Sequence, residues 1–166
     1  ALPIYSRPVT IRLQQLALAR SSVDRRAELR NDERSLRDLA ASAEARLVAV
    51  RGTDLLTADD QLQLLPLSAD LELAFLGQSA DQSRSYFCNL SPIDLEGDWR
   101  GLRQIATTLD DEQAGLAVNA VALAQWHQTH NHCPRCGSPT RVVQAGWVRR
   151  CDADGSDHFQ IGRAHV

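Results

Sequence analysis

The sequence predicts an α+β fold, in which a small antiparallel sheet with flanking helices is followed by a compact module that carries cysteines. Short strand-like segments separated by turns follow one another between residues 46 and 90. Apolar residues run nearly all round the segment 113–130, which is typical of a buried helix. Behind it, a Cys-x-x-Cys pair at Cys133 and Cys136 stands ahead of a hairpin pattern, which indicates a separate small module.

Length and composition limit the class of protein. The chain has 166 residues, of which 43% are hydrophobic and 23% charged, as in an ordinary folded domain. Its net charge of −3 argues against a broad basic face for nucleic acid. No apolar run is long enough to cross a bilayer, so we expect no membrane partner and a cytoplasmic location. The chain opens on Ala1 and contains no methionine, so we expect a piece of a longer protein.

The first helical signal comes ahead of the strands. Asp24 and Asp32 are candidate capping or first-turn acids of two short helices, and Leu36, Leu39 and Ala40 follow at helical spacing. Four strands are then expected, at residues 46–51, 62–67, 71–76 and 85–90. Turns at Gly52, at Gly77 and across residues 78–84 favour a simple antiparallel meander.

The second helical region begins after Pro92. Trp99, Leu102 and Ile105 are expected to share one face of a helix, with Trp99 in the core. The acids of residues 110–112 then favour the start of the buried helix, because a helix N-terminus stabilises negative charge. Trp126 is expected to be a core residue of that helix.

The cysteines carry the only recognisable chemistry. Cys133 and Cys136 lie in the sequence C-P-x-C-G, a turn that lets two thiolates face one ion, and Gly137 supplies the positive φ that closes it. Cys151 follows after fourteen residues, behind a segment that reads as a hairpin with its turn at residues 145–146. This spacing predicts a rubredoxin-like zinc ribbon with structural Zn²⁺.

The fourth ligand is left open by the sequence. Asp154 stands at the Cys-x-x-Cys spacing from Cys151, and His158 is its rival. Two other interpretations of the motif are a redox pair and a degenerate ribbon that keeps its shape without zinc. The remaining cysteine, Cys88, is expected to be a small buried apolar residue.

Three histidines flank the motif at the end of the predicted helix. His127, His130 and His132 are expected to be solvated or to cap carbonyl groups, although His132 could also stand in as a ligand.

These motifs together resemble the NADH pyrophosphatase (NAD diphosphatase) family of the Nudix hydrolase superfamily. The resemblance is carried by the segments 122–127 (ALAQWH), 133–137 (CPRCG), 146–147 (GW), 150–151 (RC) and 158–159 (HF). It implies an N-terminal α+β domain over residues 1–131 and a zinc ribbon over residues 132–159. Residues 160–166 depart from the family pattern and are expected to be an artefactual tail. Many relatives have a second Cys-x-x-Cys where this chain has Asp154.

The resemblance implies a function for the intact parent protein. Family members hydrolyse the pyrophosphate of NADH or NAD to nicotinamide mononucleotide and AMP with Mg²⁺ or Mn²⁺, act also on NAD-capped RNA, and are usually homodimers. Phe159 corresponds to an aromatic position near the family's substrate cleft. The glutamate-rich Nudix box that holds the catalytic ions is absent from this sequence, so we expect no catalytic residue here and a structural role for the chain.

The alternative is a binding module whose ribbon contacts nucleic acid or a protein partner. Four arginines of the ribbon favour it: Arg135, Arg141, Arg149 and Arg150. Three aspartates oppose them, at positions 152, 154 and 157, and leave residues 133–159 with a net charge of +1. Such a charge gives only a weak attraction for phosphate.

Overall fold

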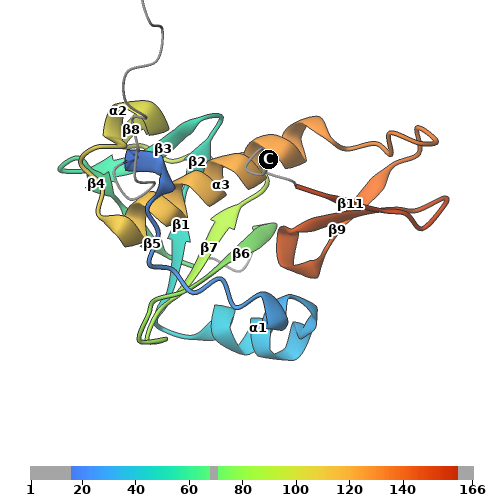
Figure 1. Cartoon of the computed structure of the whole chain (residues 1–166), viewed down its shortest axis with the longest axis horizontal. Coiled ribbons are helices and arrows are strands. Elements are labelled where there is room, and N and C mark those ends of the chain that lie inside the picture. The colour runs from blue at the N-terminus through green and yellow to red at the C-terminus, as the bar shows by residue number, and fades with distance from the viewer. Residues whose placement is uncertain (1–15, 68–70, 161–166) are drawn as a thin grey trace, which may run out of the picture.

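The computed structural model describes residues 16–67 and 71–160. Its three α-helices are α1 (Glu33–Ala41), α2 (Leu102–Ile105) and α3 (Asp111–Thr129). The strands are β1 (Ala45–Val48), β2 (Val50–Arg51), β3 (Asp54–Ala58), β4 (Gln61–Leu62), β5 (Leu64–Pro66), β6 (Leu73–Gln78), β7 (Ser85–Asn89), β8 (Asp98–Gly101), β9 (Thr140–Val143), β10 (Val148–Cys151) and β11 (Asp157–Phe159). The predicted α+β class is therefore confirmed (Figure 1).

The strands form three sheets. The central sheet has the order β5-β1-β7-β6, and a second sheet is built around β3, which pairs with β2, β4 and β8. The third sheet, β11-β10-β9, belongs to the cysteine module. Figure 1 shows this third sheet projecting to one side of the other two, beyond the C-terminal end of α3.

Alternation along the central sheet places it between two helices. Leu76 of β6 and Cys88 of β7 belong to the large core cluster shared with α3. Their sequence neighbours Phe75 and Phe87 point the other way and pack with the apolar face of α1, with ring centroids 5.3 Å apart. Because successive residues of a strand face opposite sides, the central sheet has an apolar layer on each face. Cys88 is fully buried as predicted, and burial raises the pKa of its thiol to about 12.

The predicted meander is wrong in one pairing. β1 lies antiparallel to β5 but parallel to β7, with Ala45 opposite Ser85 and Val48 opposite Cys88. A parallel neighbour requires a long crossover connection. Here the crossover contains β2, β3 and β4 of the second sheet, and β3 was not among the four expected strands.

Trp99 lies on a strand rather than on the expected helix. It belongs to β8, which pairs with β3, and α2 begins only at Leu102. The Trp99 indole donates a hydrogen bond to the Leu95 carbonyl at 3.1 Å, and the Arg51 guanidinium stacks on its ring at 4.4 Å. β8 alternates between exposed and half-buried residues, and Trp99 is one of the half-buried ones. The two contacts hold its ring at this edge of the second sheet.

Two of the three predicted acidic positions start a helix in the structure. Asp32 accepts a hydrogen bond from the Ser35 amide at 3.0 Å and starts α1, and Asp110 accepts one from the Gln113 amide at 2.8 Å and starts α3. Asp24 was predicted to be a third, but its backbone instead forms an isolated bridge with Gln78. α3 is buried on most faces, as expected.

The cysteine module docks on the central sheet. The Trp147 indole donates a hydrogen bond to the Phe75 carbonyl at 2.7 Å, and Gly146 lies against Ala74. The domain division between residues 131 and 132 stays a prediction, and all but Gln160 of the expected tail lies outside the described residues. Within residues 16–67 and 71–160, no helix combines the length and the apolar character that crossing a membrane requires.

Candidate metal centre

Two similar turns carry the cysteines. In the first, the Gly137 amide bonds the Cys133 carbonyl at 2.9 Å, and in the second the Gly155 amide bonds the Cys151 carbonyl at 3.1 Å. Both glycines have positive φ values, of +75° and +70°. The second turn therefore repeats the first, with Asp154 in the place that Cys136 holds, one residue before the glycine.

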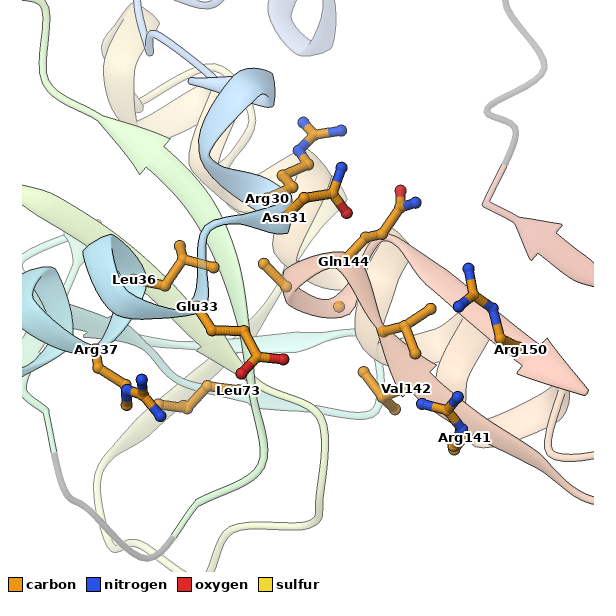
Figure 2. A pocket seen from close by; sticks show the side chains of 13 residues that line it. Arg30, Asn31, Glu33, Leu36, Arg37, Leu73, Arg141, Val142, Gln144 and Arg150 are labelled. Carbon is orange, nitrogen blue, oxygen red and sulfur yellow. The ribbon is translucent and has the colours of Figure 1, made fainter. Parts of the chain in front are cut away.

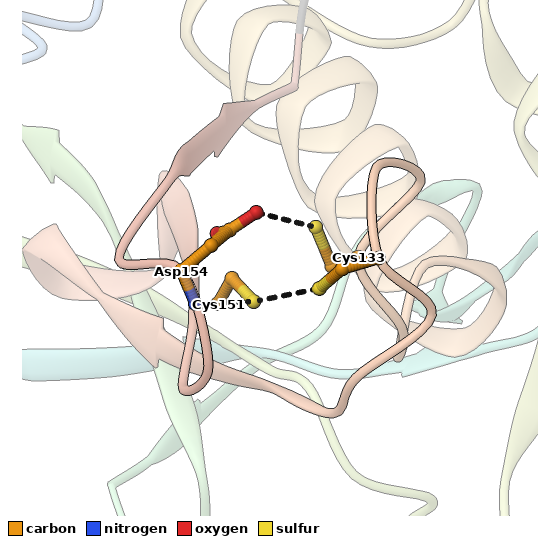
Figure 3. A group of neighbouring side chains, drawn as sticks. Cys133, Cys151 and Asp154 are labelled. Atoms are coloured by element: carbon orange, nitrogen blue, oxygen red, sulfur yellow. Dashed lines mark hydrogen bonds between the residues drawn. The ribbon is translucent and has the colours of Figure 1, made fainter.

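The two turns bring four side chains together. One ligand atom each from Cys133, Cys136, Cys151 and Asp154 lies within 4.8 Å of all the others. The sulfurs of Cys136 and Cys151 are 3.5 Å apart, and Cys133 Sγ lies 3.8 Å from Asp154 Oδ2 (Figure 3). With Zn–S bonds of about 2.3 Å, the edge of a tetrahedral site is about 3.8 Å. The donor spacing thus fits a tetrahedral zinc ion.

The arrangement argues against a redox pair. All four cysteines within the described residues are free thiols, and the close sulfur pair joins Cys136 to Cys151 across the two turns. A redox motif needs only the two sulfurs of one Cys-x-x-Cys turn, whereas here a third sulfur and a carboxylate converge with them.

The cluster also has the electrostatics of a cation site. Burial opposes ionisation of Cys133, but the amides of Arg135 and Cys136 and the Ser156 hydroxyl outweigh it and lower the thiol pKa to about 6. The Ser156 hydroxyl and amide hold the pKa of Asp154 well below its usual range. At Cys151, the Asp154 amide favours the thiolate, but burial and the neighbouring anions raise the pKa to about 11. Several negatively charged donors at this distance repel one another. A bound divalent cation would neutralise their charge and favour the ionised forms.

His158 lies one step outside the cluster. Its Nε2 is 3.1 Å from the Ser156 hydroxyl, and that hydroxyl donates to Asp154 Oδ1 at 2.6 Å. His132 forms a backbone bridge with Pro139 and is not among the four converging residues. The geometry therefore favours Asp154 over both histidines as the fourth donor.

The ribbon arginines are largely occupied. Arg150 forms a two-pronged ion pair with Asp157 at 2.6 and 2.8 Å, and Arg141 lies 3.3 Å from Asp152. Arg149 is buried, which leaves Arg135 as the exposed one of the four without an ion pair within the described residues. This pairing further reduces the basic field that a nucleic-acid interface of the ribbon would need.

A buried polar network that the sequence did not reveal joins α3 to the ribbon. His127 is only 4% exposed; its Nε2 lies 2.7 Å from the Gly146 carbonyl and its Nδ1 lies 2.8 Å from Arg149 Nη1. Arg149 also donates to the Thr140 hydroxyl and carbonyl, at 2.7 Å each. Because arginine only donates, His127 Nδ1 must accept, so Nε2 carries the proton given to Gly146. The ring is therefore neutral. His127 thus bonds a carbonyl group as expected, but it does so in the protein interior.

Acid is expected to weaken this network. Burial lowers the pKa of His127, and the nearby Arg149 charge adds to that effect, although the Gly146 carbonyl and Glu72 oppose it. Below pH 6.5 the unfolded chain therefore binds a proton that the folded chain does not, so stability falls as the pH falls, by at most about 1.4 kcal/mol per pH unit. Urea unfolding at pH 7.5 and 5.5 should show a smaller loss for His127→Gln than for the wild type.

The matched control for this pH experiment is His130→Gln, at the exposed end of the same helix. It should lose as much stability between the two pH values as the wild type does. Equal losses in His127→Gln and the wild type would contradict the assignment.

Phe159 lies at the exposed edge of the ribbon. It is 56% exposed and lines a groove of about 380 Å³ together with Trp126 and His130 of the α3 end. Trp126 is half-buried, so the prediction of a core residue is only partly met. The structure thus places an exposed aromatic ring beside two others.

Comparison with known proteins identifies the module. Residues 128–159 match the family model described as the NADH pyrophosphatase zinc ribbon domain. Residues 128–159 therefore belong to the zinc ribbon of the NADH pyrophosphatase family. Human NAD(P)H pyrophosphatase NUDT13, mitochondrial, is 32% identical over 119 residues, which cover 69% of this chain and 34% of the relative.

Two further family relatives are named for activity on NAD-capped RNA. The NAD-capped RNA hydrolase NudC of Deinococcus radiodurans is 40% identical over 55 residues, covering 33% of this chain and 20% of the relative. Human NAD-capped RNA hydrolase NUDT12 is 33% identical over 43 residues, covering 26% of this chain and 9% of the relative. The chain thus spans about a third or less of the length of these curated family members.

Proposed function

We propose that this chain is the N-terminal domain and zinc ribbon of an NAD(H) diphosphatase. The parent protein hydrolyses the pyrophosphate of NADH or NAD to nicotinamide mononucleotide and AMP, and also removes NAD caps from RNA. The observation that carries the proposal is the four-residue cluster inside a segment that matches the family's zinc ribbon. The names of the relatives point to the same substrates.

Within that protein the chain has a structural role. Cys133, Cys136, Cys151 and Asp154 hold Zn²⁺, which stabilises a module too small to bury a sufficient core of its own. The Trp147 and His127 contacts fix the ribbon against the central sheet and α3. Support for a rigid connection comes from the burial of His127 and Arg149 at this junction.

Phe159 contributes to the substrate cleft of the intact protein. Its exposed ring offers a stacking surface for a base or a nicotinamide ring. The Mg²⁺ or Mn²⁺ ions of the reaction belong to the Nudix domain of the parent, which acts as a homodimer in the cytoplasm. No Nudix box occurs in the 166 residues, so no catalytic residue is assigned to this chain.

An activity assay on two proteins tests this proposal. The purified chain, given NADH and Mg²⁺, should release no nicotinamide mononucleotide, because it lacks the glutamates that hold the catalytic ions. A longer protein, expressed from the resequenced gene and including the segment that follows residue 159, should hydrolyse NADH. Turnover by the chain alone would contradict the assignment of a structural role, and an inactive longer protein would contradict the assignment to a diphosphatase.

A further inference from the structure

A second cavity shares no lining residue with the groove beside Phe159. A cavity of about 560 Å³ opens between the start of α1 and the ribbon strands (Figure 2). Its apolar lining includes Leu36, Leu73 and Val142, which come from α1, the central sheet and the ribbon. The volume falls within the range of small-molecule sites, about 300 to 1,000 Å³. The cavity therefore has room for a ligand. Because the ribbon supplies part of its lining, the cavity forms only when the ribbon is docked on the central sheet.

Arginine dominates the polar lining. Arg30 and Arg37 line the cavity from the N-terminal side, and Arg141 and Arg150 line it from the ribbon. The two ribbon arginines have aspartate partners, yet Arg150 uses only Nε and Nη2 for its pair and keeps Nη1 available. Within the described residues, neither Arg30 nor Arg37 lies within 4 Å of a carboxylate. The cavity thus has an excess of guanidinium groups.

Arg30 is held in place without its charge being neutralised. Its guanidinium carbon lies 3.7 Å from the centre of the Trp147 ring, and its buried Nε has no hydrogen-bond partner among the described residues. Burial and the charge of Arg25 lower its pKa to about 10. Removing a cation from water without a counter-ion is unfavourable, so an anion entering this cavity would relieve that cost.

The turn that closes the cavity is itself strained. Gln144 and Ala145 both have positive φ values, of 49° and 53°, in residues other than glycine. Such backbone is held in place by its surroundings and is found more often at functional sites than elsewhere. Here the turn holds the Gln144 side chain at the edge of the cavity, beside Arg30 and Asn31 (Figure 2).

One acid shares the cavity. Figure 2 shows the Glu33 carboxylate pointing into the space between Arg37 and Arg141. It makes no ion pair within the described part of the chain. Arg141 and Arg150 have aspartate partners, whereas Arg30 and Arg37 have no carboxylate partner within the described residues. The unpaired positive charge of the lining therefore favours an anionic ligand over a cationic one.

We propose that this cavity binds a small phosphate-bearing ligand between Arg37 on the α1 side and Arg141 and Arg150 on the ribbon side, which keep donor groups outside their aspartate pairs. The planar guanidinium fork matches two phosphate oxygens at once, and an ordinary carboxylate carries less charge. The phosphate belongs either to a nucleotide or to free phosphate. This proposal does not depend on the activity of the parent protein, because it rests on the residues of the cavity alone.

Calorimetric titration of the chain with AMP and with inorganic phosphate tests the site. Arg37→Gln removes an exposed guanidinium and is expected to weaken binding about tenfold, as for a lost charged hydrogen bond. The matched control is Arg34→Gln, on the same helix but outside the cavity lining, which should change affinity less than twofold. Tighter binding of AMP than of phosphate identifies a nucleotide, and equal binding identifies the phosphate alone.

Glu33→Gln is expected to change phosphate affinity in the opposite direction from Arg37→Gln. Removal of a competing carboxylate should tighten phosphate binding several-fold, whereas Asp38→Asn, an exposed acid of α1 outside the lining, should not. Unchanged far-ultraviolet circular dichroism would establish that each variant is folded. The proposal is overturned if neither ligand binds the wild type at millimolar concentration, if Arg37→Gln and Arg34→Gln behave alike, or if Glu33→Gln weakens binding.

Discussion

Replacing Cys133 with serine is expected to abolish zinc binding and to unfold the ribbon. A hydroxyl does not ionise at neutral pH and cannot replace the buried thiolate, so the tetrahedral site loses one of its four ligands. Structural zinc supplies roughly 10 kcal/mol or more of folding free energy in small modules. We expect one zinc per wild-type chain and none in Cys133→Ser, measured by atomic absorption after gel filtration.

Cys88→Ala is the control for this experiment. It removes a thiol that is buried in the central sheet, away from the cluster, and should keep one zinc per chain. Zinc retained at full stoichiometry by Cys133→Ser would contradict the proposed site. The chelator EDTA should reproduce the effect of the serine variant on the wild type, with loss of the near-ultraviolet dichroism that Trp147 contributes at the docking contact.

The same measurement decides the fourth ligand. Asp154→Asn should lower zinc affinity markedly, because the amide oxygen carries no charge, whereas His158→Gln should leave one zinc bound. Asp154→Cys should bind zinc more tightly than the wild type, since it restores a fourth thiolate. Loss of zinc from His158→Gln together with retention in Asp154→Asn would assign the ligand to histidine.

Gly146→Ala is the second substitution with a large expected effect. A Cβ at this position would lie 2.3 Å from Ala74 Cβ and 2.7 Å from Ala74 Cα, and the backbone φ is +89°. The contact is with a buried strand rather than with a flexible side chain, so the ribbon turn must move away from the central sheet. Overpacking and positive φ together should cost roughly 3 kcal/mol of unfolding free energy in urea.

Gly52→Ala separates the two contributions. Gly52 has φ of +63°, but no atom of residues 16–67 or 71–160 lies within 4 Å of an added Cβ. This variant should therefore lose only the backbone contribution, about 1 kcal/mol. Equal destabilisation of the two variants would mean that the close approach of the ribbon turn to Ala74 contributes nothing.

Local signals predicted the local structure well. The capping acids at Asp32 and Asp110 and the apolar run of α3 each act within a few residues, so the sequence pattern was sufficient. The same holds for the first cysteine turn. The turn at Cys133 was predicted from Gly137, and the predicted hairpin sets its separation from Cys151, whereas the matching Gly155 of the second turn was not singled out.

The parts that could not be predicted depend on contacts between distant residues. The parallel partner of β1 cannot be recognised from its own sequence, because a buried strand has the same apolar pattern beside either neighbour. Trp99 reads equally well as a helical or a strand residue until β3 is placed beside it. The His127–Arg149 contact spans 22 residues and has no sequence signature.

The pairing of β1 with β7 also governs how the chain can fold as it is synthesised. β1 ends at Val48, but its parallel neighbour is complete only when Cys88 has been made, and β3 likewise waits for β8. Contacts between distant residues slow folding because the intervening loop must be closed first. On the ribosome, the nascent central sheet therefore lacks β7, one of its two inner strands, until more than half of these 166 residues have been joined, and its apolar faces are open to chaperones until then.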